Sequence, residues 1–86
     1  MDSIDLSIQA QLISIAVWYT NLENLKAFSL LQNLYSAHFN DNQIQDISAI
    51  GNCKQMRFLC LNNNLISNIE VIKHFKHLYD LSISHN

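Results

Sequence analysis

Four histidines and two cysteines are the side chains of this sequence best suited to chemistry, and their spacing limits what they could do. His74 and His77 lie three residues apart, a spacing that occurs in zinc sites. No cysteine or carboxylate pair stands at ligand spacing beside them. The sequence therefore predicts no metal site and no cofactor, and a solvated turn explains the two histidines.

His38 and Cys60 could form a different kind of site, in which an imidazole base activates a thiolate nucleophile. They are far apart in the sequence, so they become neighbours only if the fold has a period equal to their separation. Such a site also needs a group that orients the base and a pocket that holds a substrate, and the sequence offers neither. The chain is thus predicted not to be an enzyme and to have no catalytic residues.

Composition excludes several other classes of protein. An 86-residue chain forms one small domain at most. Only 14% of the residues are charged and the net charge is −2, so there is no basic field for nucleic acid or anionic lipid. The start, MDSIDLSIQAQ, is acidic where a signal peptide would be basic, and no apolar run approaches the ~20 residues of a membrane span. These features predict a cytoplasmic protein that binds neither nucleic acid nor membrane.

A 22-residue repeat runs through the chain from Leu12 onward. Asn42, Asn64 and Asn86 follow one another at this interval, and Thr20 stands one step earlier. Around these anchors 24 framework positions recur, and all are apolar if alanine and cysteine are counted. The columns before the anchor are Leu12, Leu34, Met56 and Leu78, then Ile15, Ala37, Leu59 and Leu81, then Val17, Phe39, Leu61 and Ile83. The columns after it are Leu22, Ile44 and Ile66, then Leu25, Ile47 and Ile69, then Phe28, Ile50 and Ile72, then Leu31, Cys53 and Phe75.

The pattern L-x-x-L-x-L-x-x-N-x-L, clearest in MRFLCLNNNLI and LYSAHFNDNQI, resembles that of leucine-rich repeats. It is similar to the 22-residue class found in the protein-phosphatase-1 regulatory leucine-rich-repeat protein and in bacterial internalins. The resemblance implies an α/β solenoid of about four coils, with a short parallel sheet on the concave face and 3₁₀ or irregular turns on the convex face. The repeats are expected at 12–33, 34–55 and 56–77, with an incomplete one at 78–86.

Each anchor residue stands where a strand of the solenoid would bend away. Backbone groups at such a bend would be buried without partners, at a cost of about 1–3 kcal/mol each. An asparagine amide carries two donors and an acceptor, so it can bond the backbone on both sides of the bend. Asn42, Asn64 and Asn86 are therefore predicted to form a buried ladder that Thr20 begins. The neighbouring Asn62 and Asn63 are predicted to be free for another role.

The two ends of the array are less regular. Residues 1–11 are predicted to form an N-terminal cap segment. Residues 6–18 are compatible with either a first repeat strand or a capping helix, because Ile8, Leu12, Ile15 and Tyr19 also have helical spacing. At the other end, the incomplete coil at 78–86 would leave an open strand edge, which invites association.

Alternation along each strand places every second side chain on the concave face. Trp18 and Phe58 are large aromatics on this face, of the kind that dominates binding hot spots. Tyr35, Arg57 and Tyr79 share one column beside the strands, which predicts a Tyr–Arg–Tyr stack. The predicted partner-binding residues are Trp18, Ser36, His38, Asn40, Asp41, Phe58, Asn62, Asn63 and Asp80.

The leading functional hypothesis is a non-catalytic protein–protein interaction module that binds another protein on its concave sheet. The alternative is a split or truncated structural unit that assembles through its open C-terminal edge. A more distant alternative, implied by the resemblance alone, is a regulatory subunit of a protein phosphatase.

Overall fold

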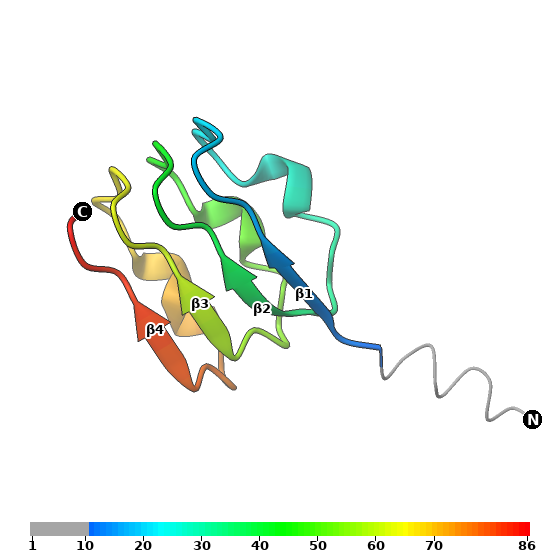
Figure 1. Ribbon diagram of the computed structural model, residues 1–86. Helices are drawn as coiled ribbons and strands as arrows, with labels where there is room; N and C mark the ends of the chain where they lie inside the picture. The colour runs from blue at the N-terminus through cyan, green and yellow to red at the C-terminus, as the bar shows by residue number, and fades with distance from the viewer. Residues whose placement is uncertain (1–10) are drawn as a thin grey trace, which may run out of the picture.

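The computed structural model describes residues 11–86 of the chain. Its strands are β1 (Ile13–Ala16), β2 (Leu34–His38), β3 (Phe58–Cys60) and β4 (Asp80–Ser82), one from each repeat. They form one parallel sheet whose strand order equals the chain order (Figure 1). Neighbouring strands pair with an offset of one repeat, so that Phe58 stands between Ser36 and Asp80. Each turn of the chain therefore advances the solenoid by one strand.

Three short 3₁₀ segments form a second layer behind the sheet (Figure 1). They are η1 (Lys26–Phe28), η2 (Ser48–Ile50) and η3 (Glu70–His74). Apolar residues three apart suit a 3₁₀ turn, since that helix has three residues per turn. The α/β solenoid predicted from the repeat, with a parallel sheet on one face and 3₁₀ turns on the other, is confirmed.

The core lies between the two layers and consists of the repeat columns. Among residues 11–86, all thirteen buried hydrophobic side chains occupy framework positions predicted from the 22-residue period. Phe39 is the largest of those that are fully buried, and its ring centroid lies 5.1 Å from that of Phe28 on η1. Contacts of this kind join the sheet to the convex layer, and losing such a ring would cost about 3–5 kcal/mol.

The first coil departs from the period by one residue. Ile13, and not Leu12, stands opposite Leu34, and the register shifts between Ile13 and Ser14. Ile13 packs against the core, while Leu12 is 39% exposed. The assignment of Leu12 to the framework is therefore wrong, because the irregularity in β1 turns its neighbour inward.

Residues 13–16 are a strand, so the capping-helix alternative is wrong for this part of the chain. Residues 11, 12, 17 and 18 are not helical either. The part of that alternative at 6–10, and the cap segment predicted at 1–11 except for residue 11, lie outside the described residues.

Ile69 is the other framework position that the structure leaves exposed, at 48%. Its counterparts Leu25 and Ile47 are each covered by the coil that follows them and are fully buried. Ile69 lies in the last convex segment of the described chain, where no further segment packs against it. The repeat period correctly assigns Ile69 to a core column, but a residue in that column is buried only where a coil packs on both sides of it.

Candidate interaction surface

Side-chain hydrogen bonds hold the coils together where the strands end, and Asn64 makes the most deeply buried set of them. Its amide Oδ1 accepts a hydrogen bond of 3.0 Å from the Ile44 amide in the preceding coil. Its Nδ2 donates to the carbonyls of Phe39, Leu61 and Asn62 at 3.0, 3.1 and 3.2 Å. Only 4% of this residue is exposed. The side chain thus joins two coils at the point where the backbone leaves the sheet.

The same contacts recur at the other anchor positions. Asn42 donates to the Val17 and Phe39 carbonyls at 2.7 and 3.0 Å. Asn86 accepts from the Ile66 amide at 3.0 Å, but it is exposed. The prediction that the ladder is buried is therefore correct for Asn42 and Asn64 and wrong for Asn86, which no further coil covers among the described residues. Thr20 differs, because its hydroxyl and its amide both donate to Asn42 Oδ1, at 2.9 and 3.0 Å. Thr20 provides two donors for the next coil, but it has no side-chain amide that could bond the backbone on both sides of the bend.

A second column of side-chain bonds runs two residues before the anchors, and the sequence interpretation missed it. Asn40 Oδ1 accepts from the Asn62 amide at 2.8 Å. Asn62 Oδ1 in turn accepts from the Ser84 amide at 2.7 Å, and from the hydroxyls of Ser82 and Ser84 at 3.0 and 3.1 Å. Asn62 is therefore not free for another role. The signal in the sequence was the 22-residue step that relates the two asparagines and the serine.

The rim of the concave face repeats an uncommon backbone conformation. Tyr19, Asp41, Asn63 and His85 have φ values of 57°, 61°, 60° and 60°. Asparagine and aspartate adopt this left-handed region more readily than other non-glycine residues. Asn63 Nδ2 also donates to Asp41 Oδ1 at 2.8 Å. The polar pair at the centre of the rim is thus explained by backbone geometry as well as by solvent exposure.

The remaining predicted site residues lie in the strands or shortly after them. Ser36 is buried, and its hydroxyl lies 3.3 Å from His38 Nε2. Trp18 is 53% exposed and follows β1. Asp80 is exposed at the start of β4 and stands beside Phe58 across the ladder. The sheet therefore brings Ser36, Phe58 and Asp80 into one row, whereas Trp18 lies further along the strand direction.

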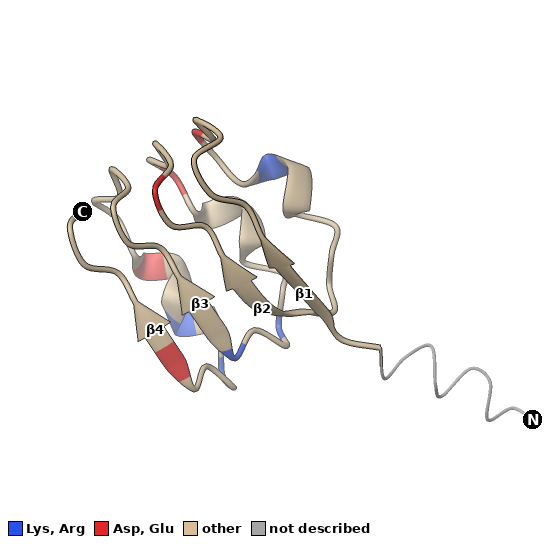
Figure 2. Ribbon diagram, in the orientation of Figure 1, with Lys and Arg blue, Asp and Glu red and all other residues tan. Residues whose placement is uncertain are grey.

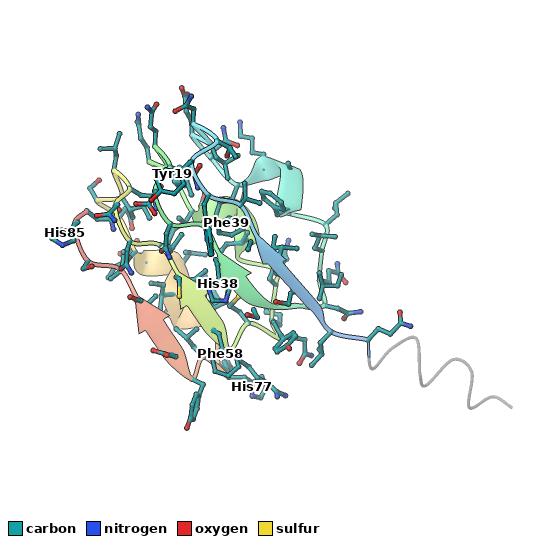
Figure 3. The ribbon with its side chains drawn as sticks, in the orientation of Figure 1. Tyr19, His38, Phe39, Phe58, His77 and His85 are labelled. Carbon is teal, nitrogen blue, oxygen red and sulfur yellow. The ribbon has the colours of Figure 1, made fainter. Side chains whose placement is uncertain are left out.

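Aromatic rings form a row where the strands begin. Phe58 lies between Tyr35 and Tyr79, with ring centroids 6.3 and 5.7 Å apart and interplanar angles of 74° and 72°. Edge-to-face geometry of this kind is favourable for aromatic pairs. The predicted Tyr–Arg–Tyr stack is wrong, because Phe58 occupies the space between the tyrosines. Figure 3 places Phe58 and His77 at this same end of the sheet.

On the convex side, a further column was not predicted. Asn24, Asp46 and Asn68 each accept a bond from the amide two residues later, at 3.0, 2.9 and 2.9 Å. These are Asx turns, and each precedes a 3₁₀ segment. The Ser48 amide and hydroxyl, and more weakly the Lys26 charge, hold the pKa of the Asp46 carboxyl below its ordinary value. The signal in the sequence was again a polar residue repeated at the same fixed step.

The structure assembles no reactive centre from the residues it describes. His38 and Cys60 are neighbours across the β2–β3 ladder. However, burial and the nearby Asp80 carboxylate raise the pKa of the Cys60 thiol, which disfavours the nucleophilic thiolate. Cys53 is fully buried, and burial raises its thiol pKa as well. Within residues 11–86, no group of three histidine, cysteine or carboxylate side chains could hold a metal ion.

Strand, asparagine-bonded bend and 3₁₀ turn, repeated with one constant period around one core, define a leucine-rich-repeat solenoid. A family model described as leucine-rich repeats in two copies matches residues 32–74, which is half of the chain. The chain belongs to the leucine-rich-repeat family, as the sequence pattern predicted. Members of this family generally serve as protein–protein interaction modules.

A solved structure, internalin C2 from Listeria monocytogenes, has the same fold. It superposes with a TM-score of 0.76 at 20% sequence identity, over 79% of this chain. The chain spans only 30% of the length of that internalin. No curated protein matches the sequence. Among the described residues, no helix is long and apolar enough to cross a membrane.

Proposed function

We propose that this chain is a non-catalytic module that binds a partner protein on its concave sheet. The observation that carries the proposal is the matched register of the four strands, which aligns their outward side chains in rows. One row runs through Ala16, His38, Cys60 and Ser82. A partner lying across the strands would contact one side chain from every coil. Such a surface suits recognition of a protein better than enclosure of a small molecule.

The predicted site residues divide into two roles in this proposal. Trp18, Phe58 and Asp80 offer exposed or half-exposed rings and a charge, so they would contact the partner directly. The polar side chains already bonded within the protein would act indirectly, by holding the strands at their spacing. These are Ser36, Asn40 and Asn62. His38 has both roles, because it is half-exposed on the sheet and also contacts the Ser36 hydroxyl. Asp41 and Asn63 border the surface at the rim.

Two exposed alanines provide a matched test. Ala16 lies on β1 of the concave sheet and Ala27 lies on η1 of the convex face. Arginine at either site adds the same bulk and charge to an exposed position. We expect partners captured by the wild-type chain to be lost with Ala16→Arg and retained with Ala27→Arg, measured by quantitative mass spectrometry of the captured proteins. Equal capture by both variants would show that the concave face is not the binding surface.

Assembly through the C-terminal edge is a second candidate function. It is favoured by the exposure of Leu65 and Ile69 in the third coil, and by the incomplete burial of Leu81 and Ile83 in and just after β4. Apolar side chains at an unpaired parallel edge are a template for a further coil or a second chain. This function requires a solution mass above that of the monomer.

A further inference from the structure

The cationic side chains of this acidic protein are concentrated at one end of the sheet. Four of its five lysines and arginines fall between residues 54 and 76. Lys54 and Lys76 lie in the turns that precede β3 and β4, and Arg57 directly precedes β3. Figure 2 shows blue segments at this end of the sheet, where these strands begin. Asp41 follows β2 at the opposite end. Lys26 lies on η1 and Lys73 on η3, so these two cations do not belong to the group at the strand starts. The local field therefore differs in sign from the net charge of −2.

Two adjacent hollows open among these cations. One has a volume of about 370 Å³ and is lined by Arg57, Phe58, His77 and Tyr79. The other has a volume of about 430 Å³ and is lined by Lys54, His74, Lys76 and His77. They share His77 in their linings, so they lie next to each other. We call this pair of hollows, with its six lining residues other than His74, the strand-entry site: Lys54, Arg57, Phe58, Lys76, His77 and Tyr79.

The aromatic part of the strand-entry site is unusually open. Tyr79 is 83% exposed, although its ring packs edge-to-face on Phe58 at 5.7 Å. An exposed tyrosine held by a half-buried phenylalanine loses little conformational freedom when a ligand covers it. Rigid, amphipathic rings of this kind are favoured at binding hot spots. The pair could therefore receive an apolar side chain from a partner.

We propose that the strand-entry site binds an acidic segment of the partner protein. An aromatic or aliphatic side chain of that segment rests on Phe58 and Tyr79, and its flanking carboxylates face Lys54, Arg57 and Lys76. Arg57 can hold a carboxylate through two parallel N–H donors. This inference rests on the proposed function, because it names the chemistry of the partner at one end of the same sheet.

The surrounding charges favour a short acidic segment over an extended polyanion. Asp80 lies beside Tyr79 on β4 and limits the cationic surface in that direction. Nucleic acid needs a long basic track that neutralises several phosphates, and Asp41 and Asp46 repel a polyanion that continues toward the far end of the sheet. A second copy of this chain could place its own Asp41 and Asp46 against these cations. Self-association and peptide binding distinguish a second copy from an acidic segment of another protein.

The test uses the full 86-residue chain and synthetic peptides. The probe is a fluorescein-labelled peptide with one tryptophan between runs of glutamate, and its controls carry lysine for glutamate or glycine for tryptophan. We expect the acidic tryptophan peptide alone to raise fluorescence anisotropy. Its affinity should fall as salt rises from about 0.05 M to about 0.5 M, because screening shortens the reach of exposed charges.

Paired variants assign the binding to this site. Lys54→Glu combined with Lys76→Glu, and separately Tyr79→Ala, should each weaken binding by about tenfold or more. Lys26→Glu and Leu30→Ala are the matched controls, since both residues are exposed on the first coil, and they should leave the affinity unchanged. Circular dichroism verifies that each variant is folded.

Several outcomes would overturn the inference. One is equal binding of the acidic and basic peptides, and another is an equal loss of affinity in the strand-entry variants and the control variants. A third is that the peptide does not bind, while the chain self-associates and Lys54→Glu with Lys76→Glu abolishes that self-association. The proposed function is tested independently by Ala16→Arg. If that variant loses the partner while the strand-entry variants retain it, the concave face stands and only the acidic-segment inference fails.

Discussion

Three consecutive asparagines, Asn62, Asn63 and Asn64, occupy three different environments. Asn64 is buried and bonds two coils through both ends of its amide. Asn62 is half-buried and receives three donors from the next coil. Asn63 is exposed with φ near 60° and bonds Asp41 across the rim. Identical side chains thus contribute differently to stability, because burial decides the cost of losing a hydrogen bond.

We predict a graded loss of stability across this stretch. Asn64→Ala should lower the free energy of unfolding by on the order of 2 kcal/mol, since buried carbonyls and the Ile44 amide lose their partner. Asn62→Ala should cost about 1 kcal/mol, because the Ser82 and Ser84 groups that donate to Asn62 can bond water instead. Asn63→Gly, which keeps the left-handed backbone accessible, should change stability by less than about 0.5 kcal/mol. Urea denaturation measures all three, and equal midpoints would contradict the assignment of Asn64 to the bend.

At the scale of elements, each 3₁₀ segment is started by the side chain two residues before it. Asn24, Asp46 and Asn68 bond the first amides of η1, η2 and η3, where no other side-chain cap is present among the described residues. A short 3₁₀ turn has few internal hydrogen bonds, so an external acceptor at its start matters more than in a long helix. Only Asp46 of the three can titrate.

This difference predicts a pH dependence that belongs to η2. The pKa of Asp46 is lower in the folded state than its ordinary value of 3.8, chiefly because of the Ser48 backbone and hydroxyl bonds. A lowered carboxyl pKa contributes stability that is present above the unfolded pKa and lost as the pH falls through the folded pKa. The melting temperature of the wild type should therefore drop more steeply than that of Asp46→Asn on acidification below about pH 4.

Asn at this position keeps the acceptor for Ser48, as the chain itself does at Asn24 and Asn68, but it cannot bind a proton. The other carboxylates are common to both proteins, so they cancel in the comparison. Parallel melting curves of the two proteins from pH 6 to acid would show that the Asp46 contact does not contribute to stability.

At the scale of the whole molecule, each coil is stabilised by the coils on either side, as in other repeat proteins. Leu59 and Leu61 are fully buried in β3 and just after it, whereas the equivalent Leu81 and Ile83 are only half-buried at the β4 edge. The Leu61 amide donates to the Ser82 carbonyl at 2.7 Å. Among the hydrogen bonds of the described residues, none is donated by the equivalent Ile83 amide. The solenoid therefore weakens toward β4.

We predict that amide hydrogen exchange follows this gradient. In a monomeric sample of the 86-residue chain, the Ile83 amide should exchange at least about a hundredfold faster than the Leu61 amide, since edge segments open at low free energy. Analytical ultracentrifugation verifies the mass of the sample. If the chain associates through this edge, Ile83 becomes protected with rising concentration, and Ile69→Lys should restore both the monomer mass and fast exchange. Full protection in a verified monomer would contradict the gradient.

The sequence by itself determined the period, the composition of the core and the family of this protein. Each of the thirteen buried hydrophobic residues stands in a column predicted from the 22-residue step. The reason is that a solenoid repeats by translation, so residues one period apart have equivalent surroundings. This equivalence does not depend on the particular contacts within a coil.

Only the tertiary structure decided how neighbouring columns meet. The ring of Phe58 lies between Tyr35 and Tyr79, where the sequence suggested Arg57, and Asn62 serves the next coil although it is adjacent to the anchor column. The register shift between Ile13 and Ser14, which leaves Leu12 outside the framework, likewise depends on how β1 pairs with β2. A one-dimensional period predicts which residues share an environment, but side-chain rotamers, backbone irregularities and the coverage of the end coils determine what that environment contains.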